Sequence, residues 1–329
     1  MLATAVFKRH PEDFVVKEIL SFEPEGEGEH LFVLVRRESM TTAEVVRRIA
    51  KVAKVQQRNV SFSGTKDKHA VVEQWFSIWL PGKEFDAQEL EKAQLTVVSA
   101  SRHRKKLKRG THKYNAFTIN LREFEGDATV VDEQLSNIQA NGFENRFGPQ
   151  RFGIDNSNLK RADSITHINE LGRQERSFTL SAIRAKLFNE VVDCRLQKFG
   201  NLHLRSGDIA MFSDGNTQFL VPEVDSSIEA RERAGEIVAS GPLWGLGGSG
   251  AADTIETLEN NVAKAFSHYC SLLDQAKMAG DRRALKVYAR GLTWQWHDDC
   301  LRLQFELPKS AYATTLLAGV FSLNEERKH

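Results

Sequence analysis

The sequence predicts an α+β fold built on a mostly antiparallel sheet, with a second domain inserted into it. Alternating apolar residues, which are typical of strands, recur through the first 125 residues of the 329-residue chain. Helical spacing of apolar residues dominates after residue 153, and strand patterns return after residue 285. We therefore expect residues 1–153 and 286–329 to complete one sheet, and residues 154–285 to form the inserted domain.

The first elements surround an acidic loop. Phe14–Ile19 and His30–Val35 alternate as strands do, and we expect them to form a hairpin around the glycine-rich segment Glu23–Glu29. Thr41 and Glu44 have the spacing of a capping box, and apolar residues recur on one helical face behind them. This pattern predicts a helix over Thr41–Val55.

Four further strands and a helix complete the first part. The helix is expected over Asp127–Ala140, because Asp127 suits its N-cap and Gly142 its end. The strands are expected over Asn59–Phe62, Val71–Leu80, Gln94–Ala100 and Phe117–Leu121.

The inserted domain is predicted to be rich in helix. Ser181–Phe199 repeats its apolar residues at helical spacing up to Gly200, and a second long helix is expected over Asp253–Ala279. Strands are then expected over Val287–Trp296 and Cys300–Leu307, followed by a helix that starts near Ser310.

Asp67 lies on the short loop between two predicted strands, flanked by Lys66 and Lys68. Gly64 gives the backbone freedom for a tight exit from the first strand. A carboxylate presented from a rigid sheet and kept ionised by adjacent cations suits attack on an electron-poor centre. A lone Lys-Asp-Lys triplet is more often a solvated turn, because exposed ion pairs are common and weak.

The longer string Ser61–Ala70, with Glu73-Gln74-Trp75, favours the functional interpretation. It resembles the Gly-x-Lys-Asp-Lys-x-Ala motif of the TruD family of tRNA pseudouridine synthases. Four more of the family's segments follow the same order across nearly the whole chain. They lie at Phe7–Val16, Asn115–Phe117, Asn145–Gly153 and Leu307–Thr314.

The resemblance implies a catalytic domain of the pseudouridine synthase type, interrupted by an inserted α/β TRUD domain. It implies isomerisation of uridine at position 13 of tRNA, usually glutamate tRNA in bacteria, without a cofactor. The catalytic aspartate corresponds to Asp67, acting as nucleophile or as base. The family places Lys8 against this aspartate, and it places Phe117 in the uracil pocket with Asn115 nearby. On the residues alone, Lys8 would be a surface lysine and Phe117 a core aromatic.

A run of seven lysines and arginines without an acid, Arg102–Lys113, predicts an RNA-binding surface. The formal net charge is only +1, but segregated charge can still build one positive face. The alternative is a solvated loop. The expected phosphate contacts from this run are Arg104, Lys105, Lys106 and Lys108.

The segment Asn145–Gly153 allows two interpretations. Arg146 or Arg151 could contact phosphate, and Arg151 is our RNA-binding candidate. Alternatively, the segment is a glycine-rich turn whose phenylalanines lie in the core.

Other function classes find little support. No stretch approaches the roughly 20 apolar residues of a membrane span, and the N-terminus is charged too soon for a signal peptide. The three cysteines are too far apart for a disulfide framework or a zinc knuckle. We therefore expect a cytoplasmic monomer that binds tRNA, without a membrane partner.

No metal or dinucleotide site is expected. His69, His103 and His112 lack the spacing of metal ligands. Gly245–Gly250 satisfies Gly-x-Gly-x-x-Gly, but no clean strand precedes it and Pro242 intervenes, so we expect a flexible connection. Two other functions stay open on the residues alone: a structured-RNA-binding protein without catalysis, and a metal-dependent RNA hydrolase, for which the loop offers only one acid.

Overall fold

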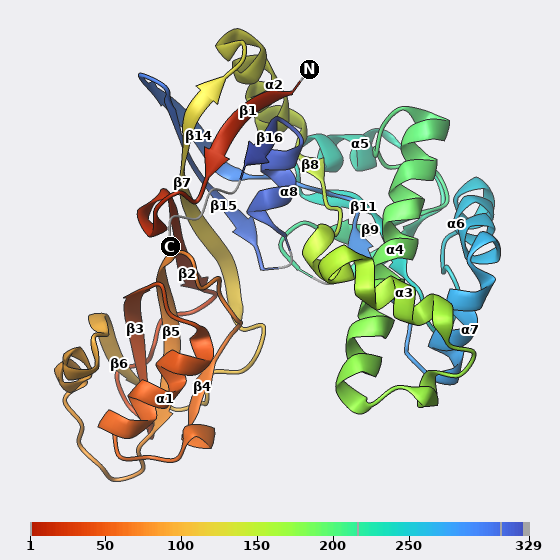
Figure 1. Cartoon of the computed structure of the whole chain (residues 1–329). Helices are drawn as coiled ribbons and strands as arrows, with labels where there is room; N and C mark the ends of the chain where they lie inside the picture. Colours follow the sequence, from red (N-terminus) through yellow and green to blue (C-terminus); the bar gives the residue numbers. More distant parts are fainter. Residues whose placement is uncertain (1, 216, 310, 325–329) are drawn as a thin grey trace. The chain divides into compact units, whose positions relative to one another are not determined.

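The computed structural model describes residues 2–215, 217–309 and 311–324. These residues divide into two compact units (Figure 1). Unit 1 comprises the described residues within Met1–Gln139, Ala289–Ala313 and Val320–His329, and unit 2 comprises those within Ala140–Tyr288 and Thr314–Gly319. No helix in the described part of the chain is long and apolar enough to cross a membrane.

Unit 1 is built on a ten-stranded sheet in the order β14-β15-β7-β2-β5-β3-β6, with β1 beside β7, β16 beside β1 and β4 beside β5. The pairings are antiparallel except for β1 with β16 and β2 with β5. The strands are β1 (Ala3–Phe7), β2 (Phe14–Leu20), β3 (His30–Glu38), β4 (Val60–Phe62), β5 (Val71–Trp79), β6 (Thr96–His103), β7 (His112–Glu125), β14 (Arg290–His297), β15 (Cys300–Pro308) and β16 (Phe321–Asn324).

Strands from the two ends of the chain join this one sheet. The hairpin of β14 and β15 adds to β7 in a register that runs from Leu301 opposite Leu121 to Pro308 opposite Tyr114. The last described strand, β16, lies parallel to β1. The central strand β7 is therefore bordered by β15 on one side, and by β2 and then β1 along its other side, because Leu121 pairs with both Leu301 and Phe7.

The expected hairpin of the first two strands is wrong. Both strands form, as β2 and β3, but β5 lies between them. It pairs parallel with β2 and antiparallel with β3. The acidic loop that follows β2 therefore passes the end of β5, where the carbonyl of Glu29 accepts from the backbone N–H of Leu80 at 2.8 Å.

A helix covers one face of this part of the sheet. The helix α1 (Thr42–Val52) begins after Thr41, whose hydroxyl accepts from the backbone N–H of Glu44 at 3.2 Å. Val45 and Ile49 of α1 are fully buried against strand residues such as Val33 and Phe76. The second helix of this part, α2 (Ala128–Asn141), has the predicted N-cap, because the Asp127 carboxylate accepts from the N–H of Thr129 at 2.9 Å.

Unit 2 packs helices around small antiparallel sheets, one in the order β10-β9-β11-β12 and one of β8 and β13. Its strands are β8 (Phe143–Glu144), β9 (Asp208–Phe212), β10 (Gln218–Val221), β11 (Ile237–Leu243), β12 (Asp281–Ala284) and β13 (Lys286–Val287). Its helices are α3 (Ser157–Ser164), α4 (Arg173–Phe199), α5 (Ser226–Arg233), α6 (Asp253–Ala265) and α7 (Ser267–Gln275).

Three helical predictions change in detail. The helix predicted to end at Gly200 does so, with Gly200 left-handed at φ 73°, but α4 begins at Arg173, earlier than expected. The second predicted helix is broken at Phe266 into α6 and α7, because Phe266 has non-helical backbone angles. The last helix, α8, spans Ala313–Ala318, and Ser310, near which we expected it to start, lies outside the described residues.

A clean strand does precede the Gly-x-Gly-x-x-Gly segment, contrary to expectation. The strand β11 includes Pro242, which pairs with Arg282 of β12. Proline is tolerated there because β9 pairs only with Ile237–Ala239 of β11, so no partner on that side requires its missing N–H. The antiparallel pairings of β11 exclude the βαβ unit of a dinucleotide site.

Candidate active site

The loop between β4 and β5 presents Asp67 to Lys8. The ammonium of Lys8 donates to Asp67 Oδ2, and the backbone N–H of His69 donates to Asp67 Oδ1 at 3.2 Å. The Lys8 side chain is 5% exposed and the Asp67 side chain 35% exposed. One carboxylate is thus held on the rim of the sheet by a buried cation.

Lys8 is not the surface lysine that its sequence context alone would suggest. It follows β1 with a left-handed backbone (φ 58°), which is uncommon for a non-glycine residue. Its ammonium lies 4.2 Å from the ring centroid of Phe14 and 4.9 Å from that of Phe7. These aromatic faces and Asp67 together stabilise the buried charge.

Phe117 lies deeper in the sheet, as a core aromatic would. It is 8% exposed on β7 and stacks on Phe305 with ring centroids 5.4 Å apart. Its other aromatic neighbour is Phe14, at 5.9 Å. Phe117 is therefore connected to Lys8 through the ring of Phe14.

Asn115 is also buried, opposite Glu18 in the pairing of β2 with β7. Among the described residues no hydrogen bond joins Asp67 to Asn115. The structure thus brings Lys8 to Asp67 directly, whereas Phe117 and Asn115 lie on the strand next to the one that carries Phe14.

The two lysines that flank Asp67 are not equivalent. Lys66 points into the sheet, where its ammonium donates to Glu18 Oε1 at 2.5 Å. The side chain of Glu18 is fully buried and that of Lys66 is 7% exposed, whereas Lys68 is exposed. Our expectation that Lys66 and Lys68 both hold Asp67 ionised is therefore wrong for Lys66, because Glu18 already takes its charge.

Glu18 was missed by sequence reasoning. Its second carboxylate oxygen accepts from the backbone N–H of Trp75 at 3.1 Å, so Glu18 ties the loop to β5 as well as to Lys66. Burial raises the pKa of Glu18, and the charge of Lys66 opposes that rise. Its sequence position, one polar residue on an alternating strand, gave no signal of this role.

Further polar side chains hold the backbone of the loop. Gln74 donates to the carbonyl of Gly64 at 2.5 Å, and Thr42 Oγ1 accepts from the N–H of Lys66 at 3.1 Å. Arg37 donates to the carbonyl of Asp67 at 3.4 Å and to Thr42 at 3.4 Å. Burial lowers the pKa of Arg37 to about 10, although Asp67 and Glu18 favour its charged form.

His112 and Ser63 support the first turn of the loop from β7. Ser63 Oγ lies 2.6 Å from His112 Nδ1 and accepts from the backbone N–H of His112 at 2.8 Å. Burial, followed by the charges of Lys66 and Lys309, lowers the pKa of His112 to about 4. His112 is therefore neutral at pH 7. Among the described residues, no three His, Cys, Asp or Glu side chains form a group that could hold a metal ion.

The basic run is partly neutralised, contrary to the expectation that no acid compensates it. The acidic loop folds against it: Gly26 donates to the carbonyl of Arg102 at 2.9 Å, and Arg104 pairs with Glu27 and lies 3.7 Å from Glu25. Because the loop crosses the end of β5, charges separated in the sequence become neighbours.

Four exposed cations of the run, among the described residues, remain outside these contacts. Leu107 is 2% exposed and its N–H donates to Ser77 Oγ at 3.1 Å, which anchors the tip of the run. Arg109 lies over the ring of Phe62 at 3.8 Å. We call the three exposed lysines the lysine cluster: Lys105, Lys106 and Lys108.

In unit 2, Arg146 and Arg151 have different kinds of partner. Arg146 pairs with Glu144 and, at 2.8 Å, with Asp193, so nearby carboxylates balance its charge. Arg151 donates to Ser181 Oγ of α4 at 2.9 Å and lines a large cavity. Phe147 packs against the core of unit 2, edge-on to Phe188. The segment therefore has features of both interpretations.

The whole chain is similar to proteins of one family. The model of the family described as tRNA pseudouridine synthase D (TruD) matches residues 3–162 and 156–320. The tRNA pseudouridine synthase D of Pseudoalteromonas atlantica is 36% identical over 331 residues, which cover 98% of this chain and 93% of that protein. The one of Pseudomonas fluorescens is 38% identical over 326 residues, covering 98% and 92%.

A solved structure has the same fold. The crystal structure of the putative tRNA pseudouridine synthase D from Methanosarcina mazei superposes with a TM-score of 0.72 and covers 97% of this chain and 94% of that one. Its sequence identity is 21%, so this likeness bears on the fold alone. The expected fold class, an α+β sheet of the pseudouridine synthase type with an inserted domain, agrees with it.

Proposed function

Because this chain belongs to the TruD family of tRNA pseudouridine synthases, we propose that it converts uridine to pseudouridine at position 13 of tRNA, with glutamate tRNA as its target. We propose Asp67 as the catalytic residue. The observation that supports this most is the ion pair of Asp67 with the buried Lys8, on a loop that five other side chains hold in place. A solvated turn would need neither a buried cation nor such support.

The reaction is an isomerisation. The bond from uracil N1 to ribose C1′ breaks, the base turns, and a bond from C5 to C1′ forms. C5 loses a proton and N1 gains one, so no atom is added or lost and no electron is transferred. A protein carboxylate is sufficient for this chemistry, and we propose that no cofactor takes part.

Asp67 has two possible roles. As a nucleophile it attacks C1′ while uracil leaves, and it is released when C5 attacks the same carbon. As a base it removes a proton from the ribose and returns it after the base has turned. In both roles the carboxylate must be ionised, and the ammonium of Lys8 stabilises that form electrostatically.

Phe117 is proposed to stack on the uracil after the nucleotide has left the helix, with Asn115 beside it. The ring of Phe117 is covered by Phe305 in this structure. Phe117 is 8% exposed, so stacking of the base on its ring requires side chains around it to move.

We further propose that the chain has two domains with different roles. Residues 1–153 and 286–329 would form the catalytic domain, and residues 154–285 the inserted TRUD domain. The active form would be a cytoplasmic monomer. The lysine cluster and Arg151 would contact tRNA, whereas Arg104, already paired with acids, would contribute less than the sequence suggested.

Conversion of uridine in purified tRNA tests the function. The wild-type protein should form pseudouridine at a single position, equally well with and without a chelator. Binding of tRNA without conversion would instead indicate an RNA-binding protein, and chelator-sensitive cleavage would indicate a metal-dependent hydrolase. Asp67→Asn should abolish conversion while tRNA affinity stays within several fold, and substantial turnover by this variant would exclude Asp67 as the catalytic residue.

A further inference from the structure

Unit 2 contains a cavity of about 820 Å³ whose charged lining is entirely positive. Among the described residues that line it there are five arginines and no aspartate or glutamate. We call it the arginine pocket, after Arg151, Arg173, Arg176, Arg184 and Arg283. A lining of this kind attracts an anion, because no carboxylate within the pocket offsets the charge.

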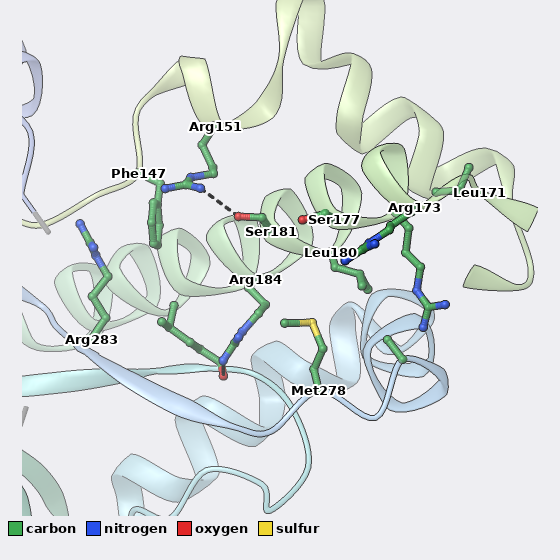
Figure 2. A pocket seen from close by; sticks show the side chains of 13 residues that line it. Phe147, Arg151, Leu171, Arg173, Ser177, Leu180, Ser181, Arg184, Met278 and Arg283 are labelled. Atoms are coloured by element: carbon green, nitrogen blue, oxygen red, sulfur yellow. Dashed lines mark hydrogen bonds between the residues drawn. The ribbon is translucent and has the colours of Figure 1, made fainter. Parts of the chain in front are cut away.

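One face of α4 forms the length of the pocket. Arg173, Ser177, Ser181 and Arg184 recur at helical spacing, so they point to the same side of the helix (Figure 2). Arg176 and Leu180 of the same helix also line the pocket. From Arg173 to Arg184 the helix rises about 16 Å. At about 3.4 Å per stacked nucleotide, this length exceeds one phosphate and matches a stretch of roughly five nucleotides.

The arginines differ in how firmly they are held. Arg184 donates to the carbonyls of Leu243 at 2.7 Å and Ala279 at 3.3 Å. Arg283 donates to the backbone carbonyl and to the side-chain oxygen of Asn145. These contacts build the inner end of the pocket. Burial lowers the pKa of Arg184. The charge of Asp281, which does not line the pocket, partly offsets this fall.

The outer end carries cations that are available to a ligand. Arg173 is exposed and has no hydrogen bond or ion pair within the described part of the chain. Arg176 is half-buried and donates to Asn169 at 3.0 Å, a neutral partner, and it forms no ion pair with a described carboxylate. Arginine binds phosphate with two parallel hydrogen bonds, so these two side chains suit a phosphate backbone.

Part of the remaining lining is apolar. Leu180, Leu243 and Met278 contribute apolar surface, and the ring of Phe147 lies 4.2 Å from the guanidinium of Arg283. Bases of single-stranded RNA are held by stacking on aromatic rings and guanidinium planes, while phosphates are held by cations.

We propose that the arginine pocket binds a single-stranded stretch of the RNA substrate, with phosphates on Arg173 and Arg176 and a base against the wall of Leu180 and Met278. This inference rests on the proposed function, because that function makes RNA the substrate of the protein. All residues that line the pocket belong to unit 2, whereas Asp67 belongs to unit 1.

A double variant with a matched control tests the pocket. Arg173→Gln with Arg176→Gln removes two cations from the pocket, and Lys198→Gln with Arg233→Gln removes two exposed cations of unit 2 that do not line it. Binding of unmodified tRNA is measured by fluorescence anisotropy over a salt series. The pocket variant should bind roughly tenfold more weakly at low salt, with a salt slope lower by about 1.4 to 1.8. The control should stay within twofold of wild type. Equal slopes in the two variants would overturn the proposal.

Arginine footprinting separates RNA from smaller anions. Modification of Arg173 by phenylglyoxal is followed by mass spectrometry in the presence of tRNA, an unstructured oligoribonucleotide, uridine monophosphate or inorganic phosphate. We expect protection by the two RNAs at concentrations where the small anions give none. Protection by phosphate or the mononucleotide as strong as that by RNA would show a small-anion site and overturn the RNA assignment. The footprint needs no turnover, so a protein that forms no pseudouridine would refute the proposed function and leave this test intact.

Discussion

The ion pair of Lys8 with Asp67 predicts that removing one partner has a much larger effect on stability than removing the other. Asp67→Asn leaves the ammonium of Lys8, which is 5% exposed, without a counter-charge between two aromatic rings. Breaking a buried pair in this way costs about 3–5 kcal/mol. Because Asp67 is 35% exposed, water can reach the site, and we expect the lower end, about 3 kcal/mol.

Lys8→Met leaves the carboxylate of Asp67 without its cation, at a position that water reaches. Asp67 keeps its contact with water and with the N–H of His69, and the flexible methionine can pack between Phe7 and Phe14. We expect the free energy of unfolding to change by less than about 1 kcal/mol. Adding Lys8→Met to Asp67→Asn should therefore recover most of the stability that Asp67→Asn alone loses.

Activity should behave differently from stability. All three variants lack the charged pair, so Lys8→Met should lower kcat by about 100-fold, the usual effect of removing one electrostatic contact at a reaction centre, and the variants without Asp67 should be inactive. Chemical unfolding followed by tryptophan fluorescence reports mainly on unit 1, where four of the five tryptophans lie. The control is Lys17→Met, which removes an exposed lysine from Glu73 while Arg36 remains as a partner of that carboxylate, and it should cost less than about 1 kcal/mol. If Asp67→Asn is as stable as wild type, or if the double variant is no more stable than Asp67→Asn, the buried-cation argument is refuted.

Three further predictions follow from contacts around the loop. Glu18→Gln should cost about 3–5 kcal/mol by stranding the buried ammonium of Lys66, and it should lower kcat with little change in tRNA affinity; unchanged unfolding and kcat would remove Glu18 from the positioning role. Replacing the lysine cluster with glutamine should lower the salt slope of tRNA binding by about 2 to 3, and Arg104→Gln should lower it much less, so a larger effect at Arg104 would contradict the pairing with the acidic loop. His112, with a folded pKa of about 4 against an ordinary 6.5, binds fewer protons in the folded than in the unfolded state, so stability should fall as pH drops from 6.5 to 4 by at most about 3 kcal/mol. His112→Gln should lose less over the same interval, as measured by urea unfolding at each pH.

The sequence located the candidate site well where a residue's role depends on its own segment. The loop around Asp67 and the segment around Lys8 were identified together by their motifs, and the structure joins them by an ion pair. The helix that begins after Thr41 and the stop at Gly200 were predictable because caps act within one turn.

The pairing of Glu18 with Lys66 was not predictable, because it joins residues 48 positions apart. Lys66 and Lys68 look alike in the sequence, and a loop has no periodicity that would tell which one points inward. The pairing of Arg104 with the acidic loop was not predictable for a related reason. We assumed adjacent strands from adjacent sequence, whereas parallel pairing of β2 with β5 displaces β3 and carries the acidic loop across to the basic run.

The sheet of unit 1 combines early strands with the late strands β14, β15 and β16, and this has a consequence for biosynthesis. Lys8 follows β1, and β1 pairs with β16, which includes some of the last residues that the structure describes. Most of unit 2 is contiguous in sequence, so it can fold while the ribosome is still translating, whereas unit 1 must wait for β14, β15 and β16. Pairing of such distant segments is slow, because a long loop has to close first. We expect ribosome-bound chains that stop before Ala289 to resist protease in residues 140–288 and to be cleaved in residues 1–139. Equal resistance of both regions would show that the first strands reach a stable fold by themselves. With the expected result, a nascent chain is unable to act on RNA until β14, β15 and β16 have been synthesised.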